Sequence, residues 1–485
     1  MFRLLNVYTI SAFAALGGAL FGFEISSMSG VVGTDQYKSF YGNPVGTRQG
    51  VITSAMAAGS LVGALSSSFL ADWLSRKVAI QLGTVVWCIG AAIQASSTGV
   101  KMLIIGRVVA GLCIGLTSSI VPIYQSEIAP RKVRGRIVSF QQFAITCGIL
   151  IQYIIQYGCS FLDSAASFRV PWAIQAVPAI ILFIGLFWFP RSPRWLASKD
   201  RWDEVLHILA ILRTPNCDIN DPLVLAEYKE NEEQIWTERA EESNSYRELF
   251  GKKMRKRLFL GMAVQAWSQL SGTNFFLYFI VYILDSVRIS NTLLFSLILY
   301  ILFMVATIPS ILWTDQWGRR PSMLVGSISM AFWLYLVGAP NQAYTWVITG
   351  HPAASHTILV SSYMATASFA ASWGPVSWMY PTEIIPLRIR AKAVSISTAT
   401  NWAINFMLGI FFIFGSFNIV AFIHVWLLAP ETKQHTLEEM DEIFEHGDLS
   451  WRGLTGEHNV HRLDLLANDI RSNRLRQHQT VREKT

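Results

Sequence analysis

Charged residues are scarce in this sequence. Only 15% of the 485 residues are Asp, Glu, Lys or Arg, and 52% are hydrophobic, whereas an average soluble domain carries about 25% charged residues. Apolar stretches of about 20 residues, long enough to cross a bilayer core, recur along most of the chain. We therefore expect an all-α polytopic membrane protein, because a membrane barrel would show shorter segments of alternating polarity.

Several chemical signatures are also missing. The five cysteines are scattered without a CxxC pair, and the nine histidines form no metal or triad spacing. No GxxxxGK[ST] motif for an ATP-driven pump occurs. We expect no enzyme activity, no catalytic residue, no bound metal and no cofactor.

The basic excess has a membrane explanation. Lys and Arg concentrate in alternate short loops, which predicts that these loops and both termini are cytoplasmic and that no nucleic acid is bound. The apolar N-terminal stretch is expected to be a signal-anchor and first span. The expected inner loops carry Arg76, Lys77, Arg131, Lys132, Arg134, Arg136, Arg319, Arg320, Arg388, Arg390 and Lys392.

The apolar runs predict two six-helix bundles. The expected spans are 7–29, 49–70, 79–97, 102–124, 138–158, 172–189, 258–284, 292–312, 322–339 and 357–380, followed by an apolar block at 393–429. This gives an N-terminal bundle at 1–189, a cytoplasmic helical linker at 190–256, a C-terminal bundle at 257–429 and a charged cytoplasmic tail at 430–485.

The two halves repeat each other. YQSEIAPRKVRGR (124–136) and YPTEIIPLRIRAK (380–392) share Tyr, Glu, Ile, Pro and Arg, and FLADWLSRK (69–77) resembles WTDQWGRRP (313–321). Parallel repeats with a site between them are a known transporter architecture.

The repeat also exposes a shortened final hairpin. Arg134 to Pro190 covers 56 residues and two spans, whereas Arg390 to Pro430 covers only 40. Two spans need about 40 residues before any turn. The last two helices are therefore unusually short, or part of the hairpin is missing.

Glu24 is an acid in the middle of the first span. A carboxylate there costs roughly 3 kcal/mol on insertion scales. Arg107 in the fourth span lies at a matching depth, about six residues from the outer end of its helix. The two side chains can pair, and a change in pairing would let Glu24 bind and release a proton. The alternative is a polar residue in a water-filled vestibule.

Charged residues at the expected cytoplasmic ends could form a gate that parts during transport, although solvated loops would explain the arginines equally well. The candidate gate residues are Asp72, Glu127, Arg134, Arg319, Arg320, Glu383 and Arg390.

Neutral amides and tryptophans inside the spans suit a neutral polyol, because amides offer donors and acceptors and aromatic faces cover C–H surface. Interhelical hydrogen bonding is the alternative. These residues are Gln141, Gln142, Gln265, Ser268, Gln269, Thr273, Asn274, Asn401, Asn405, Trp373 and Trp378.

The motifs GRVVAG, PIYQSEIAPRKVRGR, PRSPRWL, DQWGRRP, WGPVSWMYPTEIIPLRIRAK and PETKQHTLEEM together resemble the sugar porter family of the major facilitator superfamily, most closely fungal hexose transporters. The resemblance implies the major facilitator fold, alternating access, proton coupling through Glu24 and Arg107, and a functional monomer in the lipid bilayer. It implies sugar binding by Gln142, Ser268, Gln269, Asn274, Trp378 and Asn405.

The resulting hypothesis is a monosaccharide (hexose) transporter of the plasma membrane that works by sugar:proton symport. A facilitated-diffusion uniporter and a non-transporting sugar sensor are the alternatives. Departures from the family pattern include Glu24 for Asp, Ser75 for Gly and Arg191 for Glu. Arg191 reverses a charge at the inner gate, and the departures together are expected to loosen that gate.

Overall fold

The structure is a computed structural model of the chain. It describes residues 6–44, 47–214, 216–240, 246–286, 291–343, 352–407, 414–430 and 432, and within these ranges every regular element is a helix. The predicted tail beyond Thr432 lies outside the described residues.

The first half contains six spans, the first and last of which are interrupted. Its helices are α1 (Val7–Ala14), α2 (Leu16–Ser29), η2 (Val31–Gly33), α3 (Asp35–Phe40), α4 (Thr47–Leu74), α5 (Arg76–Ala95), α6 (Val100–Ile128), η3 (Arg131–Val133), α7 (Arg134–Cys159), α8 (Ala166–Ile174), α9 (Ala176–Gly185) and η4 (Leu186–Trp188).

The linker folds into α10 (Pro193–Ser198), α11 (Trp202–Arg213), α12 (Pro222–Ala240) and α13 (Tyr246–Leu249). The second half consists of α14 (Lys252–Leu270), α15 (Thr273–Ser286), α16 (Thr292–Trp317), α17 (Arg319–Ala343), α18 (Pro352–Ala371), α19 (Trp373–Ile384), α20 (Leu387–Met407) and α21 (Phe414–Leu428).

Two predicted spans of the second half are broken helices. Gly272, between α14 and α15, has φ +85°, which only glycine adopts without strain. Ser372 separates α18 from α19 with φ −132° and ψ −84°. Broken spans bring free backbone groups and polar side chains to mid-membrane depth, which is tolerated where they line a protein interior or a cavity.

Eight helices of the described ranges are long and apolar enough to span a bilayer, six in the first half and two (α16 and α17) in the second. The remaining helices of the second half are the broken α14/α15 and α18/α19, the polar α20 and the short α21. Residues 408–413 of the predicted short hairpin lie outside the described residues; on either side of them, α20 is described to Met407 and α21 from Phe414.

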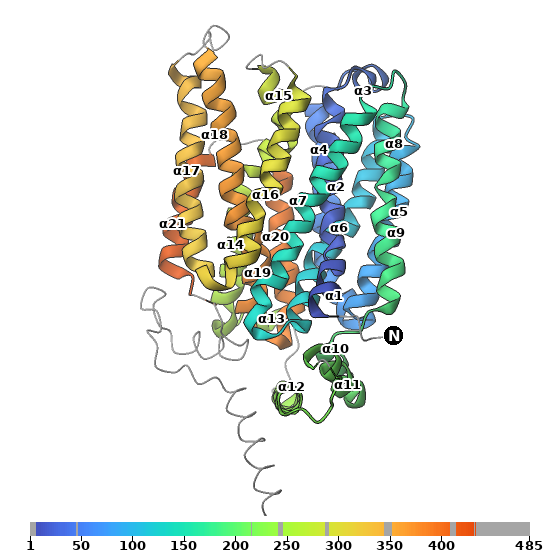
Figure 1. Cartoon of the computed structure of the whole chain (residues 1–485), viewed down its shortest axis with the longest axis vertical. Coiled ribbons are helices and arrows are strands. Elements are labelled where there is room, and N and C mark those ends of the chain that lie inside the picture. The colour runs from blue at the N-terminus through green and yellow to red at the C-terminus, as the bar shows by residue number, and fades with distance from the viewer. Residues whose placement is uncertain are drawn as a thin grey trace, which may run out of the picture.

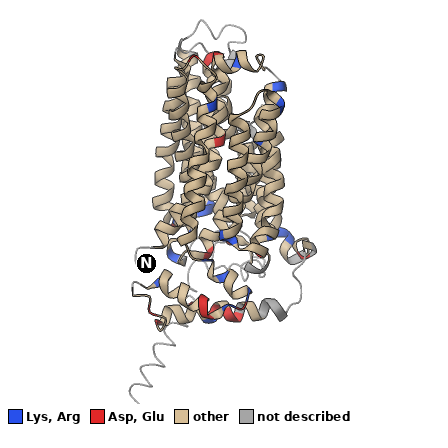
Figure 2. Ribbon diagram, turned by 90° about the vertical axis from the view of Figure 1, so that its right-hand side faces the viewer, with Lys and Arg blue, Asp and Glu red and all other residues tan. Residues whose placement is uncertain are grey.

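The two bundles stand side by side (Figure 1), with α4 packed on α20 and α7 on α16 along two seams. The linker helices lie at one end, here called the linker end, and α3 lies at the other, here called the far end. Figure 2 shows that acidic and basic residues gather at both ends and in the linker, while the middle is almost uncharged. The charge distribution thus fits a bilayer around the middle of the bundles.

Candidate functional site

Glu24 and Arg107 form an ion pair within the first bundle. Arg107 Nη1 lies 3.0 Å from Glu24 Oε1, and both side chains are completely buried. Gln94 of α5 donates to the other carboxylate oxygen at 3.5 Å, and Arg107 donates to the Thr53 carbonyl at 3.3 Å. The predicted pairing is therefore present in the structure. Removing one partner of such a pair leaves a buried charge, at a cost of about 3–5 kcal/mol.

Small residues allow this pair to form. A Cβ built on Gly115 of α6 would lie 1.9 Å from the Ser60 carbonyl oxygen of α4, so only glycine permits this approach. The close α4–α6 contact places the Thr53 carbonyl within reach of Arg107. Gly106 leaves room for Gln94 in the same way, because a Cβ there would lie 2.8 Å from Gln94 Cγ.

Amide side chains pair in two rungs between α14 and α20. Asn401 donates to Gln265 at 2.6 Å, and Asn405 donates to Gln269 at 2.8 Å. The residues of each helix are four apart, so both rungs lie on one face of each helix. Asn274, from α15 beyond the break, also donates to Gln269.

These amide pairs bring together three of the second-half residues predicted to bind substrate, Gln269, Asn274 and Asn405. Ser268, next to Gln269, is buried, with 4% of its surface exposed. The interhelical hydrogen bonds of the alternative hypothesis are present too, so these amides have structural partners as well.

Two predicted substrate-binding residues join the two bundles. Trp378 of α19 donates its indole N–H to Gln142 of α7 at 3.1 Å. Neighbouring Gln141 instead packs against Gly18 of α2, and neither of its amide atoms has a hydrogen-bond partner in the structure. Of the two adjacent glutamines, Gln142 is therefore the one that faces the second bundle.

A second contact between bundles was missed by sequence reasoning. Trp402 of α20 donates to Ser118 of α6 at 3.1 Å, and its ring lies edge-on to Phe21 with centroids 4.8 Å apart. Aromatic and hydroxyl residues are common in membrane spans, so nothing in the sequence distinguishes Trp402 or Ser118 from other such residues.

At the linker end each half carries an ion-pair cluster. In the first half, Arg76 lies 3.2 Å from both Asp72 and Glu127. In the second half, Arg319 lies 3.0 Å from Asp315 and 2.7 Å from Glu383. The four acids thus occupy corresponding positions in the two repeats, and Asp315 is the one that was not predicted as a gate residue.

One of these clusters crosses the seam between bundles. Asp315 of α16 accepts a hydrogen bond from the Arg136 backbone N–H at 2.9 Å, in the first turn of α7. Arg136 Nη2 also donates to the Leu312 carbonyl at 3.3 Å. A carboxylate at a helix N-terminus is stabilised by the helix dipole. These contacts join α7 to α16 at the linker end.

The remaining gate candidates have other partners. Arg320 donates to the Trp426 carbonyl of α21 at 2.9 Å, and Arg390 donates to the Ile385 carbonyl at 2.9 and 3.1 Å. Arg134 is buried at the start of α7.

Arg191 lies outside the ion-pair clusters described above. Its guanidinium lies 5.5 Å from the centroid of the Trp195 ring, and Trp195 donates to the Asp72 carbonyl at 3.2 Å.

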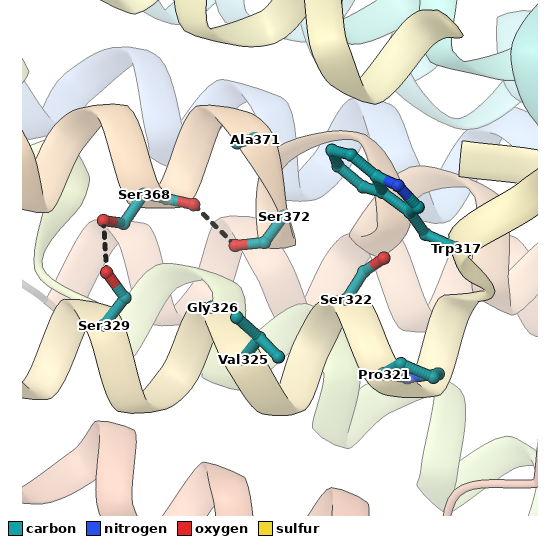
Figure 3. Close-up of a pocket in the computed structure, with 9 residues that line it drawn as sticks. All are labelled: Trp317, Pro321, Ser322, Val325, Gly326, Ser329, Ser368, Ala371 and Ser372. Atoms are coloured by element: carbon teal, nitrogen blue, oxygen red, sulfur yellow. Dashed lines mark hydrogen bonds between the residues drawn. The ribbon is translucent and has the colours of Figure 1, made fainter. Parts of the chain in front are cut away.

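A cavity of about 510 Å³ lies between α17 and α18. Figure 3 shows it beside the Ser329–Ser368 and Ser372–Ser368 hydrogen bonds, with Trp317 at one end. None of the predicted substrate residues lines it. Val325 on its wall is 68% exposed, so the cavity opens on the outer flank of the bundle, where lipid would lie.

Two helix bundles joined by a linker, with polar side chains meeting between them, define a multi-pass transporter. Comparison with known proteins agrees. The family described as "Sugar (and other) transporter" matches residues 10–444.

The MFS glucose transporter mfs1 of Aspergillus flavus is 48% identical, over 96% of this chain and 94% of that protein. The high-affinity glucose transporter of Kluyveromyces lactis is 39% identical, over 92% and 86%. A structure of the proton:xylose symporter XylE of E. coli, bound to 6-bromo-6-deoxy-D-glucose, has the same fold, with a TM-score of 0.80 at 24% identity over 90% of this chain and 99% of that one. The chain belongs to the sugar porter family of the major facilitator superfamily.

Proposed function

We propose that this protein carries a hexose of the glucose class across the plasma membrane, together with a proton. The observation that carries the proposal is the fully buried Glu24–Arg107 pair. The names of the two fungal relatives support glucose, and that of XylE supports proton coupling.

Sugar binding is assigned to Gln142, Ser268, Gln269, Asn274, Trp378 and Asn405. Amides that now bond to each other can exchange these bonds for sugar hydroxyls at little net cost, because each retains a partner. Gln142 and Trp378 come from different bundles, so a sugar between them would contact both. Binding energy could then be used to draw the bundles together.

Proton coupling is assigned to Glu24. When Glu24 is ionised, Arg107 neutralises it; when Glu24 is protonated, Arg107 is released to other acceptors such as the Thr53 carbonyl that it already contacts. When one partner of a buried ion pair gains or loses a proton, the other is left as an uncompensated buried charge unless the surroundings rearrange. Protonation would therefore be linked to movement of α2 against α6.

Gating is assigned to the linker-end clusters, namely Asp72, Glu127, Arg134, Arg319, Arg320, Glu383 and Arg390. Since Asp315 joins α16 to the start of α7, opening of this end requires that contact to break. We take the linker end, with both termini, as cytoplasmic, because the excess of Lys and Arg lies there.

The proposal is tested by uptake of labelled glucose, galactose and xylose into cells that lack hexose transporters. We expect hexose uptake that rises at acid outside pH and loses its accumulation when an uncoupler collapses the proton gradient. Uptake that ignores the uncoupler would favour the uniporter, and specific sugar binding without uptake would favour the sensor.

Glu24→Gln provides the residue-level test. It keeps the shape of the side chain but cannot ionise, so we expect sugar exchange across the membrane to persist while accumulation against a gradient is lost. Glu24→Asp retains the acid and serves as the control, with accumulation preserved at reduced rate. Full accumulation by the glutamine variant would exclude the assigned role.

A further inference from the structure

An aromatic cluster covers the first bundle at the far end. The outer aromatic cap, as we call it, comprises Tyr37, Phe40, Tyr41, Phe168 and Trp172, from α3, the residue after it, and α8. Tyr37 and Tyr41 are almost fully buried, at 1% and 3% exposure, and their ring centroids lie 5.0 Å apart.

The cap also seals the ion pair from the far end. Met28, Val31 and Val32 follow Glu24 along the chain and pack with Tyr37 and Tyr41 in one buried apolar cluster.

Arg169 of α8 contacts the edge of the cap. Its guanidinium lies 5.4 Å from the centroid of the Phe40 ring, and it donates a hydrogen bond of 3.2 Å to the Ser97 carbonyl.

Tyr37 heads a chain of hydrogen bonds that ends at Arg107. The Tyr37 hydroxyl donates to Gln49 Oε1 at 3.1 Å, and Gln49 Nε2 donates to Thr53 Oγ1 at 3.3 Å. Thr53 offers its carbonyl to Arg107. All four residues are buried. The orientation of the guanidinium is thus linked, through one turn of α4, to a tyrosine of α3.

Tyr41 heads a second chain that ends at Glu24. Its hydroxyl lies 2.6 Å from Ser97 Oγ, and Ser97 Oγ donates to the Gln94 carbonyl at 2.6 Å. Because the Ser97 proton is used in that second bond, Tyr41 is the donor in the first. The Gln94 side chain then donates to Glu24. Burial raises the pKa of Tyr41, so this hydroxyl keeps its proton at physiological pH.

We propose that Tyr37 and Tyr41 are positioning residues for the proton-coupling pair, each holding one partner of the Glu24–Arg107 pair through its own hydrogen-bond chain. The chains pass through backbone carbonyls, so they orient groups rather than conduct protons. The inference rests on the proposed role of Glu24 as the proton carrier. Among the described residues, the titratable groups facing Glu24 are Arg107 of α6 and Tyr278 of α15; Gln94 of α5 adds a neutral amide.

The two hydrogen-bond chains predict the direction in which the protonation midpoint of Glu24 should shift. Loss of either tyrosine hydroxyl withdraws support from a group that stabilises ionised Glu24, so the carboxylate should protonate at higher pH. One hydrogen bond corresponds to a rise of about 0.5 to 1 pH unit in the protonation midpoint. The Tyr37 and Tyr41 rings lie 5.0 Å apart and both chains end at one ion pair, so we expect the shifts of Tyr37→Phe and Tyr41→Phe to be coupled rather than additive.

The test uses the full-length protein in proteoliposomes. Dicyclohexylcarbodiimide modifies protonated buried carboxyl groups, so the pH dependence of Glu24 modification, read by mass spectrometry, reports its protonation without requiring transport. The pH profile of proton-driven hexose uptake is measured in parallel. We expect both midpoints to rise in each Tyr→Phe variant.

Matched variants separate positioning from a general effect. Tyr157→Phe removes a hydroxyl from α7, outside both chains, and should leave the midpoints unchanged. Ser97→Ala should reproduce the Tyr41→Phe shift, and the double variant should shift no further, because both changes break one chain.

The inference fails if Tyr37→Phe and Tyr41→Phe leave the modification midpoint where it is, or if Tyr157→Phe moves it equally. Failure of the proposed proton symport would give a different experimental result. Wild-type uptake would then ignore pH, while the carbodiimide titration would still show whether the tyrosines set the protonation of Glu24.

Discussion

Two equivalent residues of the repeats, Ser75 and Gly318, both have a positive φ angle, which is free of strain only for the glycine. Gly318, before α17, has φ +87°, and Ser75, at the corresponding place before α5, has φ +92° and ψ 155°. Glycine adopts this region freely, but for other residues it costs about 1–3 kcal/mol. Ser75 recovers part of the cost as the N-cap of α5, accepting from the Val78 N–H at 3.4 Å.

We predict that Ser75→Gly stabilises the protein by about 1 kcal/mol, because the relieved strain exceeds the lost cap and the added freedom of the unfolded chain. Thermal unfolding of the detergent-solubilised protein measures this as a higher midpoint temperature. Ser54→Gly, within the regular helix α4, is the control and should lower the midpoint. A lower midpoint for Ser75→Gly would show that the cap outweighs the strain.

Residues whose role depends on depth alone could be predicted from the sequence. Glu24 and Arg107 are the charged residues deep in the apolar spans of the first half, so matching depths sufficed to pair them. Gln94 carried a weaker signal as an amide in an apolar span. Tyr37, Tyr41 and Ser97 carried none, because they lie in or beside connections whose packing depends on distant helices.

At the scale of elements, Arg213 is one of the residues that fasten the linker to the first bundle. Arg213, the last residue of α11, makes two hydrogen bonds to Glu227 of α12, at 2.6 and 2.7 Å, and donates to the Ile128 carbonyl at the end of α6 at 2.8 Å. Burial alone would raise the pKa of Glu227, but the charge and hydrogen bonds of Arg213 outweigh it and hold the pKa below its usual 4.5.

This lowered pKa predicts how the contact responds to pH. A carboxyl group with a depressed folded-state pKa stabilises the fold above its unfolded value near 4.5, and that stabilisation is lost as the pH falls further. Glu227→Gln should therefore cost about 1.5–3 kcal/mol near neutral pH. The difference from wild type should begin to shrink below about pH 4.5, where the carboxyl of the unfolded chain becomes protonated, and should be lost as the pH falls through the lowered folded-state pKa.

Thermal unfolding midpoints from pH 7 to pH 3.5 test this. Glu204→Gln removes a carboxylate from an exposed pair with Arg201, 41% and 45% exposed, which should contribute little. A difference between Glu227→Gln and wild type that is constant across the pH range would contradict the ionic account.

Element boundaries show where sequence patterns stop being informative. The helix break at Gly272 is indicated in the sequence by a Gly-Thr pair between polar residues. The break at Ser372 carries no such signal, because Ser372 lies in a continuous run of small and apolar residues. Hydropathy records where a chain enters the bilayer. It does not record where tertiary contacts, such as the Trp373 indole donating to Ser327 of α17 at 2.9 Å, make a bent helix more stable than a straight one.

At the scale of the whole molecule, the final hairpin is the point where the repeats diverge most. Helix α21 has 15 residues, and at 1.5 Å per residue it is about 22 Å long, against a hydrocarbon core of about 30 Å. Figure 1 places it beside the lower part of α17, near the linker end. A helix shorter than the hydrocarbon core is matched by local thinning of the bilayer.

The linker end of this hairpin nevertheless follows the repeat. Tyr124 donates its hydroxyl to the Pro190 carbonyl at 2.8 Å in the first half, and Tyr380 donates to the Pro430 carbonyl at 2.8 Å in the second. Thr432 donates to Glu383 beside it. Chain exit from the second bundle is therefore fixed to the same face as chain exit from the first, so by residue 430 the chain has returned to the end at which α20 begins.

We therefore predict that an epitope fused to the C-terminus is reached by antibody only after the cells are permeabilised. An epitope inserted between Gly42 and Asn43, at the far end, should be reached in intact cells and serves as the control. The Tyr380 hydrogen bond places residue 430 at the linker end, and the Lys and Arg excess predicts that this side is cytoplasmic. If the C-terminal epitope were exposed on intact cells, the block 393–429 would cross only once, and the contacts of Pro430 with α19 could not exist in the membrane-inserted protein.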